Sequence, residues 1–317
     1  MSNPRTVRRA IKQPQRQQPQ RLSWLALYLI FLNILCLGMA ASLYLPQPTA
    51  PVQVMQPTVA AQGGPVALAV AGDPAPPPAQ LPAPPTATPS GPLQAGPVPI
   101  LMYHYVRTVD PALDSLGYAL SVAPATFEAH LAWLRENGYS TVSMATAQRC
   151  IQGEAACPPK ALVLTFDDGY LDAYTEALPA LQRYGFVGTF YIVNSFVGQP
   201  GYMSWQQVAE LHEAGMEIGA HTLDHPDLTV IDQAEAHRQI AQSKLDIEAR
   251  LGFQVNSFCY PAGRYTTDTI ALVREAGYAN ATTTRWDEDY GDPLAYPRRR
   301  VQGGKGVETF AAVVRGW

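Results

Sequence analysis

Two adjacent acids, Asp167 and Asp168, end the apolar segment ALVLTF. Neighbouring carboxylates repel each other, so this position at the end of a buried-looking strand calls for a chemical explanation. His221 and His225 lie four residues apart further along the chain, within GAHTLDHP. One carboxylate and two imidazoles leave a coordination position of a divalent metal open, as catalytic sites do. The HxxxH spacing is weak evidence by itself, but combined with an acid from another segment it indicates a catalytic metal site.

Apolar runs and helical patterns alternate from residue 98 to the C-terminus. Strands that alternate with helices form a mainly parallel sheet. We therefore predict an α/β fold, an irregular (β/α) barrel of about seven units, with a doubly wound open sheet as the alternative. The predicted strands cover 98–106, 140–144, 161–166, 187–193, 216–222, 256–261 and 278–284, and the predicted helices cover 125–139, 171–184, 204–215, 232–251 and 267–276, before a short helical tail.

The candidate residues fall at the carboxyl ends of these strands, where a barrel gathers its chemistry. His104, Asp168 and His221 each end or follow a different predicted strand. A helix N-cap would explain Asp168 alone, and a hydrogen-bonded core imidazole would explain His221 alone. Neither alternative explains why the candidates share one rim. The remaining histidines, predicted to be ordinary surface or boundary residues within helices, are His130, His212 and His237.

The segments TFDDGY, HTLDHP and YPAG resemble the first three motifs of the polysaccharide deacetylases, the NodB-homology or carbohydrate esterase family four group. The resemblance extends over residues 98–302. It implies an irregular barrel of β/α units that removes N-acetyl, sometimes O-acetyl, groups from glycans such as chitin oligomers, peptidoglycan and poly-N-acetylglucosamine. It also implies one divalent metal, commonly zinc, with cobalt, nickel or manganese as alternatives. The implied metal ligands are Asp168, His221 and His225, and the implied general base is Asp167.

The third motif departs from the usual family pattern. Cys259 occupies the position of an arginine that usually braces the catalytic base, and Ala262 replaces an aromatic residue. The resemblance implies that the backbone N–H of Ala262 still reaches the oxyanion. It also favours Arg298, in PRRRV, as the replacement partner of Asp167. A solvated basic edge over residues 298–300 is the alternative.

The family's last motif supplies a histidine as general acid, but no histidine follows Pro297. The first strand contains Leu-Met-Tyr-His, and some members that act on poly-N-acetylglucosamine begin with a similar strand. We therefore assign His104 as the general acid, with a structural role as the alternative. The residues predicted to contact substrate, for which burial in the core is the alternative for any aromatic, are Tyr170, Tyr260, Pro261 and Tyr265.

The N-terminal third does not have the composition of a domain. Residues 1–22 are basic and predicted to be a disordered cytoplasmic tail. Residues 23–45 are apolar over a length that spans a bilayer, which predicts a single-pass signal anchor with the N-terminus in the cytoplasm; a cleaved signal peptide is the alternative. Residues 46–97 are predicted to be a Pro/Ala-rich linker. Residues 98–317 form the predicted catalytic domain, outside the cytoplasm.

Charge and cysteine content limit the possible partners. The formal net charge is −4, and the tail carries six positive charges and the linker one negative charge, which leaves −9 for residues 98–317. An acidic domain is a poor candidate for binding nucleic acid. Cys150 and Cys157 could form a disulfide outside the cytoplasm or remain two thiols. Protein partners are not predicted.

These features together predict a metal-dependent hydrolase of the cell envelope that deacetylates a glycan at amide bonds and releases acetate. A catalytically inactive glycan-binding protein on the same fold is one alternative. A metal amidase acting on a small molecule is the other. The predicted anchor and linker favour a polymer, because a small metabolite needs no such reach.

Overall fold

The computed structural model describes residues 96–286 and 289–317. The predicted tail and anchor, and the linker up to residue 95, lie outside the described residues. Within the described ranges, no helix has the length and apolar character needed to cross a membrane. The fold of this part is α/β, as predicted.

Eight strands form a parallel sheet with the order β7-β6-β5-β4-β3-β1-β8, and β2 pairs with β3. This parallel order fits the predicted barrel. The strands are β1 (Ile100–Tyr103), β2 (Ser140–Thr141), β3 (Ala161–Phe166), β4 (Thr189–Ile192), β5 (Glu217–Ala220), β6 (Ser257–Cys259), β7 (Asn280–Thr282) and β8 (Arg299–Arg300).

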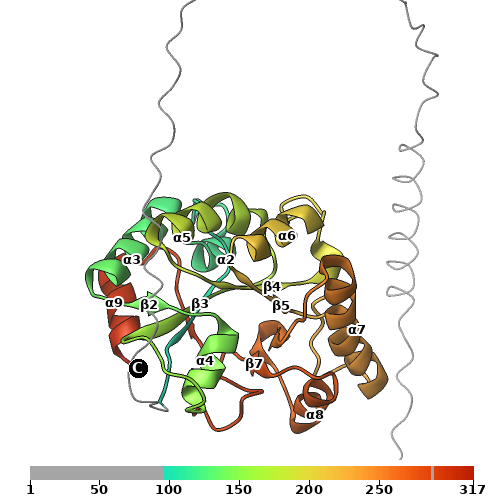
Figure 1. The fold of residues 1–317 in the computed structure, drawn as a ribbon. Helices are drawn as coiled ribbons and strands as arrows, with labels where there is room; N and C mark the ends of the chain where they lie inside the picture. The colour runs from blue at the N-terminus through green and yellow to red at the C-terminus, as the bar shows by residue number, and fades with distance from the viewer. Residues whose placement is uncertain (1–95, 287–288) are drawn as a thin grey trace, which may run out of the picture. The chain divides into compact units, whose positions relative to one another are not determined.

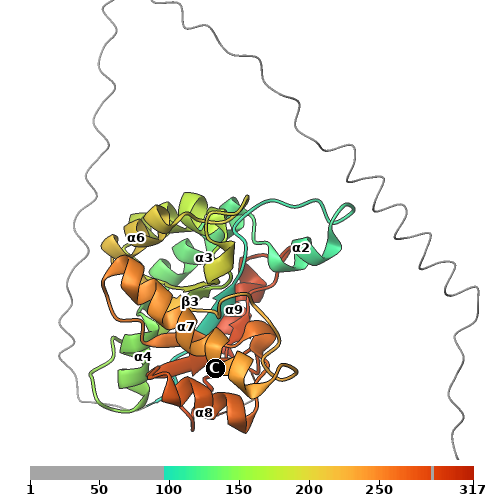
Figure 2. The ribbon, with the colours of Figure 1, turned by 90° about the vertical axis from the view of Figure 1, so that its right-hand side faces the viewer.

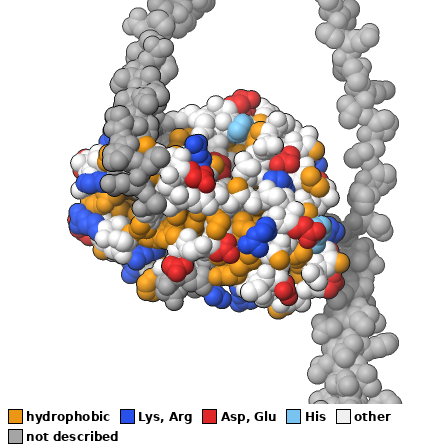
Figure 3. Space-filling model, turned by 60° about the horizontal axis from the view of Figure 1, so that its bottom comes forward, with side chains coloured by type: hydrophobic (Ala, Val, Ile, Leu, Met, Phe, Trp, Pro, Cys, Tyr) orange, Lys and Arg blue, Asp and Glu red, His pale blue; other side chains and the backbone are white. Residues whose placement is uncertain are grey.

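Helices surround the curved sheet (Figures 1 and 2). Two of the α-helices, α2 and α4, were not predicted, and the predicted helix 171–184 begins with a π-helical turn. The helices are α2 (Ser115–Leu120), α3 (Pro124–Glu136), α4 (Met144–Ile151), η1 (Ala173–Ala177), α5 (Leu178–Tyr184), η2 (Asn194–Phe196), α6 (Trp205–Glu213), α7 (Gln233–Leu251), η3 (Pro261–Gly263), α8 (Thr267–Glu275) and α9 (Val307–Arg315). Figure 3 shows Lys and Arg side chains lying among Asp and Glu side chains on one face of this part.

The segment that leads into β8 links the two ends of the sheet. Tyr296 forms a parallel bridge with Thr282 at the end of β7. Three residues later, Arg299 pairs with Leu101 of β1, and Val301 N–H donates to the carbonyl of Met102. This link explains how residues just before β8 reach the interior of the barrel.

Side chains alternate between two buried layers along the strands, as the period of two requires. In β3, Leu162 and Leu164 pack with the outer helices, whereas Val163 belongs to an inner cluster enclosed by the sheet. Residues two apart face the same side, so Thr165 and then Asp167 continue the inner row. The alternation therefore directs the first acid of TFDDGY into the barrel.

Helix α4 packs at the end of the barrel where the strands begin. Met144 and Ala147 belong to the inner cluster with Ile100. Glu217, the first residue of β5, accepts a hydrogen bond from Ala145 N–H through Oε2 (3.0 Å). That carboxylate satisfies a backbone donor in the first turn, where a helix favours negative charge. The packed end leaves the opposite end of the barrel for polar residues.

Cys150, in the last turn of α4, forms a disulfide with Cys157. The alternative of two free thiols is therefore wrong for this structure. The bond closes a loop between α4 and β3, two elements that meet at the packed end of the barrel. The disulfide stabilises the folded state because it restricts the unfolded chain.

Gly219 in β5 gives a test of this packing. A Cβ at this position would lie 2.6 Å from the ring of Tyr191 and 2.9 Å from the carbonyl oxygen of Ser257. We expect Gly219→Ala to lower the free energy of unfolding by about 1–3 kcal/mol, the usual cost of overpacking. Urea unfolding would measure it. Gly96→Ala is the control, because nothing lies within 4 Å of its added Cβ, and an equal loss in both variants would contradict the packing argument.

Candidate active site

The three predicted ligands converge at the carboxyl ends of β3 and β5. Asp168 Oδ1 lies 3.4 Å from His221 Nε2 and 3.5 Å from His225 Nε2. The three candidate ligand atoms all lie within 4.8 Å of one another. Asp168 and His221 are buried, whereas the His225 side chain is partly exposed. The group therefore has an approach from solvent, as an open metal site needs.

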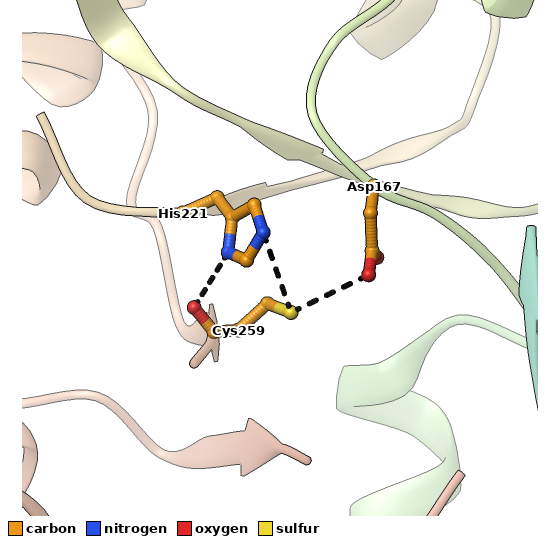
Figure 4. A group of neighbouring side chains, drawn as sticks. All are labelled: Asp167, His221 and Cys259. Carbon is orange, nitrogen blue, oxygen red and sulfur yellow. Dashed lines mark hydrogen bonds between the residues drawn. The ribbon is translucent and has the colours of Figure 1, made fainter. Parts of the chain in front are cut away.

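The orientation of His221 fits a metal ligand. Its Nδ1 lies 2.7 Å from the carbonyl oxygen of Cys259 (Figure 4). A carbonyl can only accept, so Nδ1 carries the hydrogen, and Nε2, on the side of Asp168, is the nitrogen that a metal would bind. A hydrogen bond from the second ring nitrogen is the usual way in which proteins orient a metal-binding histidine. The donor set of one oxygen and two nitrogens fits zinc and its first-row neighbours.

Backbone strain is concentrated at the same rim. Of the five non-glycine residues with positive φ in the described ranges, only Lys160 lies outside the three motif segments. The others are Asp168 (73°), Thr222 (69°), His225 (58°) and Ala262 (52°). Such conformations cost about 1–3 kcal/mol each and persist where the surroundings enforce them, commonly at functional sites. Their clustering supports the assignment of this rim as the site.

Asp167 faces the interior of the barrel and has a separate partner. Arg298 Nη1 donates to Asp167 Oδ1 (2.7 Å), and Arg298 Nη2 donates to Asp167 Oδ2 (2.8 Å). Both side chains are buried, with Arg298 only 1% exposed. Burial alone would raise the pKa of Asp167, but the guanidinium beside it holds that pKa below its usual value. Two hypotheses were given for residues 298–300. The structure agrees with the pairing of Arg298 with Asp167, and it contradicts a solvated position for Arg298.

Further contacts fix the Arg298 side chain. Its Nε donates to the carbonyl of Thr283 (2.9 Å), and Nη1 also donates to Thr165 Oγ1 (2.9 Å). Arg298 Nη2 lies 3.0 Å from the Sγ of Cys259. Cys259 is buried, and its Sγ also lies 3.8 Å from Asp167 Oδ2. The small cysteine leaves room for the guanidinium, which a larger side chain at this inward position would occupy.

A second group of potential ligands, Asp167, His221 and Cys259, also lies within 4.8 Å (Figure 4). The Arg298 guanidinium already binds both oxygens of Asp167 and contacts the sulfur. A cation at this second position would meet that fixed positive charge at close range. The arrangement therefore favours the Asp168 group as the metal site and leaves Asp167 ionised beside it.

The register of β1 and β3 brings His104 to the same rim. Tyr103 pairs with Phe166, and Asp167 N–H donates to the carbonyl of Tyr103 (3.0 Å). His104 therefore follows β1 at the level at which Asp167 follows β3. Burial lowers the pKa of His104, and the nearby carboxylates of Asp167 and Asp168 oppose that effect. The placement is compatible with proton transfer at the site.

Ala262 follows β6, the strand that pairs with β5, and lies within η3. Its backbone is left-handed, and the next residue, Gly263, packs directly against Thr284, where an added Cβ would lie 2.1 Å from Oγ1. This close approach fixes the turn that carries Ala262. Donation of its N–H to an oxyanion stays a prediction.

The predicted substrate contacts have different environments. Tyr260 is fully buried, and its hydroxyl donates to the carbonyl of Leu294 (3.0 Å), so its assignment as a substrate contact is wrong. Tyr260 faces the outer layer because it directly follows the inward-facing Cys259. Pro261 is also buried.

Tyr170 is partly exposed and stacks on Tyr105 at 3.7 Å between ring centroids, which covers one ring face. Tyr265 is partly exposed, and substrate contact by Tyr170 or Tyr265 stays a prediction.

Sequence reasoning missed two features near the site. The Thr165 hydroxyl and the Thr283 carbonyl hold Arg298, but no role was predicted for either residue. Thr165 is the first residue of TFDDGY, and only the alternation of β3 could have indicated that it faces inward. His130, predicted to be an ordinary surface or boundary residue, is 1% exposed. Its helix, α3, packs against α9, a contact that local sequence does not indicate.

Comparison with known proteins gives three findings. The family profile described as Polysaccharide deacetylase matches residues 155–281. "Putative polysaccharide deacetylase YxkH" of Bacillus subtilis (strain 168) is 31% identical over 214 residues, which cover 68% of this chain and 74% of that protein. "Poly-beta-1,6-N-acetyl-D-glucosamine N-deacetylase" of Escherichia coli (strain K12) is 35% identical over 119 residues, which cover 32% of this chain but 18% of that protein.

Among solved structures, "Streptococcus pyogenes deacetylase PplD in complex with acetate" aligns with a TM-score of 0.65. The alignment covers 70% of this chain and 99% of that one, at 24% sequence identity. At this identity the likeness is one of fold.

The Asp167–Arg298 pair predicts a large and pH-dependent stability effect. Arg298→Met would leave a carboxylate buried without its partner, which costs about 3–5 kcal/mol of unfolding free energy at neutral pH. Urea unfolding is the measurement, because guanidinium chloride is itself a salt and would screen the charges. Arg300→Met, an exposed neighbour, is the control, with an expected change below about 0.5 kcal/mol.

The same variant also predicts how the difference in unfolding free energy changes with pH. The folded pKa of Asp167 is lowered in the wild type, so its contribution to stability is present above the unfolded pKa and is lost as pH falls through the folded pKa. In Arg298→Met burial is unopposed and raises that pKa. We expect the stability difference between wild type and variant to shrink as pH falls from 7 to 4, because the variant's carboxyl becomes neutral. A constant difference would contradict the role of this charge pair.

Proposed function

This chain belongs to the polysaccharide deacetylase family, and we propose that it is a metal-dependent enzyme that hydrolyses N-acetyl groups of an envelope or extracellular glycan. The products would be acetate and a glycan with a free amino group. One observation carries the proposal: Asp168, His221 and His225 converge with an approach from solvent, while Asp167 is held ionised beside them by Arg298. Two adjacent acids with different partners are suited to different roles.

Asp168, His221 and His225 would hold one divalent ion, zinc or alternatively cobalt, nickel or manganese. A bound ion supplies Lewis acidity at this position and makes a water molecule a stronger nucleophile at neutral pH. The Cys259 carbonyl keeps His221 in the tautomer that such a ligand needs. Burial would raise the pKa of Asp168, but His221 holds it below its usual value, so the carboxylate is available as a ligand.

Asp167 would accept the proton of the attacking water. The Arg298 guanidinium binds both of its oxygens, which fixes the carboxylate plane and leaves only its remaining lone pairs for the proton. His104, one strand away, would donate a proton to the departing amine. The backbone N–H of Ala262 would donate to the carbonyl oxygen as negative charge develops on it.

A glycan rather than a small amide is favoured by the relatives, since the Escherichia coli protein is described as acting on poly-β-1,6-N-acetyl-D-glucosamine. An inactive glycan-binding protein would not need Asp167 to be kept ionised by a buried guanidinium, an arrangement that is costly to build. Poly-N-acetylglucosamine, peptidoglycan and chitin-like polymers are the candidate substrates.

We also propose that the domain works outside the cytoplasm, attached to the membrane through residues 23–45. The Cys150–Cys157 disulfide supports an oxidising compartment. The composition of residues 46–97 supports an extended linker between membrane and domain. Labelling of intact cells with a membrane-impermeant reagent directed at the domain would test this orientation.

The base and the metal can be tested by acetate release. We expect the full chain to release acetate from at least one of poly-N-acetylglucosamine, peptidoglycan and chitin oligomers, with the rate lost on chelation and restored by zinc. Asp167→Asn should lower the rate by about 10²-fold or more, since general base catalysis is typically worth that much. Full activity after thorough chelation, or in Asp167→Asn, would rule out the mechanism.

The general acid has its own test. His104→Ala should lower the rate of acetate release by at least about tenfold. His237→Ala is a matched control, because His237 is an exposed helical residue 3.9 Å from Glu275, and its rate should equal that of the wild type. If the two variants behave alike, His104 is structural.

A further inference from the structure

A cavity of about 200 Å³ lies beside the beginning of helix α9. Lys305 gives one part of its lining a positive charge, and Val301, Phe310 and Val313 make another part apolar. None of the described residues that line it is acidic. The cavity therefore combines positive charge with a hydrophobic wall.

His130 contributes a buried nitrogen to the same cavity. Its ring stacks on Phe310 with 4.1 Å between centroids, and its Nδ1 lies 3.2 Å from the hydroxyl of Tyr103. Its Nε2 is buried without a hydrogen-bond partner among the described residues. Leaving a buried polar atom unpaired costs about 1–3 kcal/mol, so such atoms usually meet a ligand or water.

The chemistry of Tyr103 indicates which nitrogen carries the hydrogen. Burial lowers the pKa of His130 to about 4, so the imidazole is neutral at physiological pH. A phenol is a stronger acid than a neutral imidazole N–H, and an imidazole nitrogen is a stronger base than a phenol oxygen. The Tyr103 hydroxyl therefore donates to Nδ1, and Nε2–H of His130 is a donor in need of an acceptor.

Helix α9 adds further donors. It spans nine residues, Val307–Arg315, and its N-cap is Gly306, which has no side chain to bind the free N–H groups of the first turn. Gly306 and Thr309, on either side of this turn, line the cavity. Glu308 is the acid of the first turn, but it is exposed and does not line the cavity. The helix end therefore favours a negatively charged ligand.

A second hollow of about 370 Å³ adjoins the first, since both are lined by Lys305 and Gly306. Arg107 lines this second hollow, and again none of its described lining residues is acidic. The positive charge thus extends beyond the cavity and gives an anion a route of approach.

We propose that this cavity is a binding site for a small aliphatic carboxylate, separate from the candidate active site. The carboxylate would lie against Lys305 and the start of α9 and accept the Nε2–H of His130. Its aliphatic part would pack on Phe310 and the neighbouring apolar residues. The hydrophobic wall favours a carboxylate over inorganic phosphate, whose oxygens all need polar partners. The carboxylate can be that of a free acid or one carried on a sugar.

Calorimetric titration of the full chain with sodium acetate and sodium propionate would test this, at constant ionic strength after metal chelation. Chelation and a parallel titration of Asp168→Asn remove binding that depends on the metal site. We expect saturable binding in both proteins, tighter for propionate than for acetate, and much weaker for inorganic phosphate. Because no turnover is measured, failure here is distinct from failure of the proposed deacetylation.

Two variants locate the binding. Lys305 is exposed, so Lys305→Met should fold normally and weaken propionate binding by about tenfold or more, the usual loss for a charged hydrogen bond. His130→Phe keeps a ring against Phe310 and removes the donor, with an expected loss of about fivefold or more. Lys160→Met, which removes the same charge outside the cavity, should bind propionate as the wild type does.

The outcomes are decisive. Absence of saturable carboxylate binding, equal affinity for phosphate and propionate, or equal affinity in Lys305→Met and Lys160→Met would each overturn the proposal. A comparison of N-acetylmuramic acid with N-acetylglucosamine separates the two sources. If N-acetylmuramic acid binds more tightly than propionate and N-acetylglucosamine does not bind, the natural ligand is a carboxylate carried on a sugar. If propionate binds more tightly than N-acetylmuramic acid, the natural ligand is a free acid.

Discussion

The ion pair between Asp167 and Arg298 determines how the rest of the site is arranged. A carboxylate this deeply buried is stable only with a partner that matches both of its oxygens. The guanidinium does so, and it is itself held by Thr165, Thr283 and Cys259. Those contacts come from strands on different sides of the barrel, so the pair forms only when the barrel is complete. The geometry of the candidate site and folding therefore depend on the same contact.

That requirement explains the role of the segment from Tyr296 to Arg300. One end pairs with β7 and the other with β1, which holds Arg298 between the two ends of the sheet and directs it inward. A cysteine at position 259 is compatible with this arrangement, because the guanidinium occupies the space next to its sulfur. Asp168, the neighbour of Asp167, instead turns towards the histidines through a left-handed backbone. One short turn thus separates two like charges into two environments.

The two buried layers of the domain have different chemistry. The inner layer holds α4 and apolar side chains at one end and the candidate metal ligands and Asp167 at the other. The outer layer, between strands and helices, is apolar around Tyr260 but contains His130 under Phe310. The proposed carboxylate site lies where this outer layer meets the start of α9. Tyr103 and His104 are consecutive residues, yet they belong to these two separate regions because adjacent strand residues face opposite sides.

The sequence by itself determined the alternation of most strands and helices, the parallel α/β class, and the three candidate metal ligands, because these depend on short periodic patterns and motifs. It also indicated Asp167 and Arg298, but three consecutive arginines could not be distinguished by composition. Tertiary structure decided between them: Arg299 pairs with the outward-facing Leu101, so Arg298 faces inward. It also decided that Tyr260 is core, that α4 packs into the barrel, and that His130 is buried. Each of these depends on which elements meet across long separations in the chain, and local sequence carries no record of those contacts.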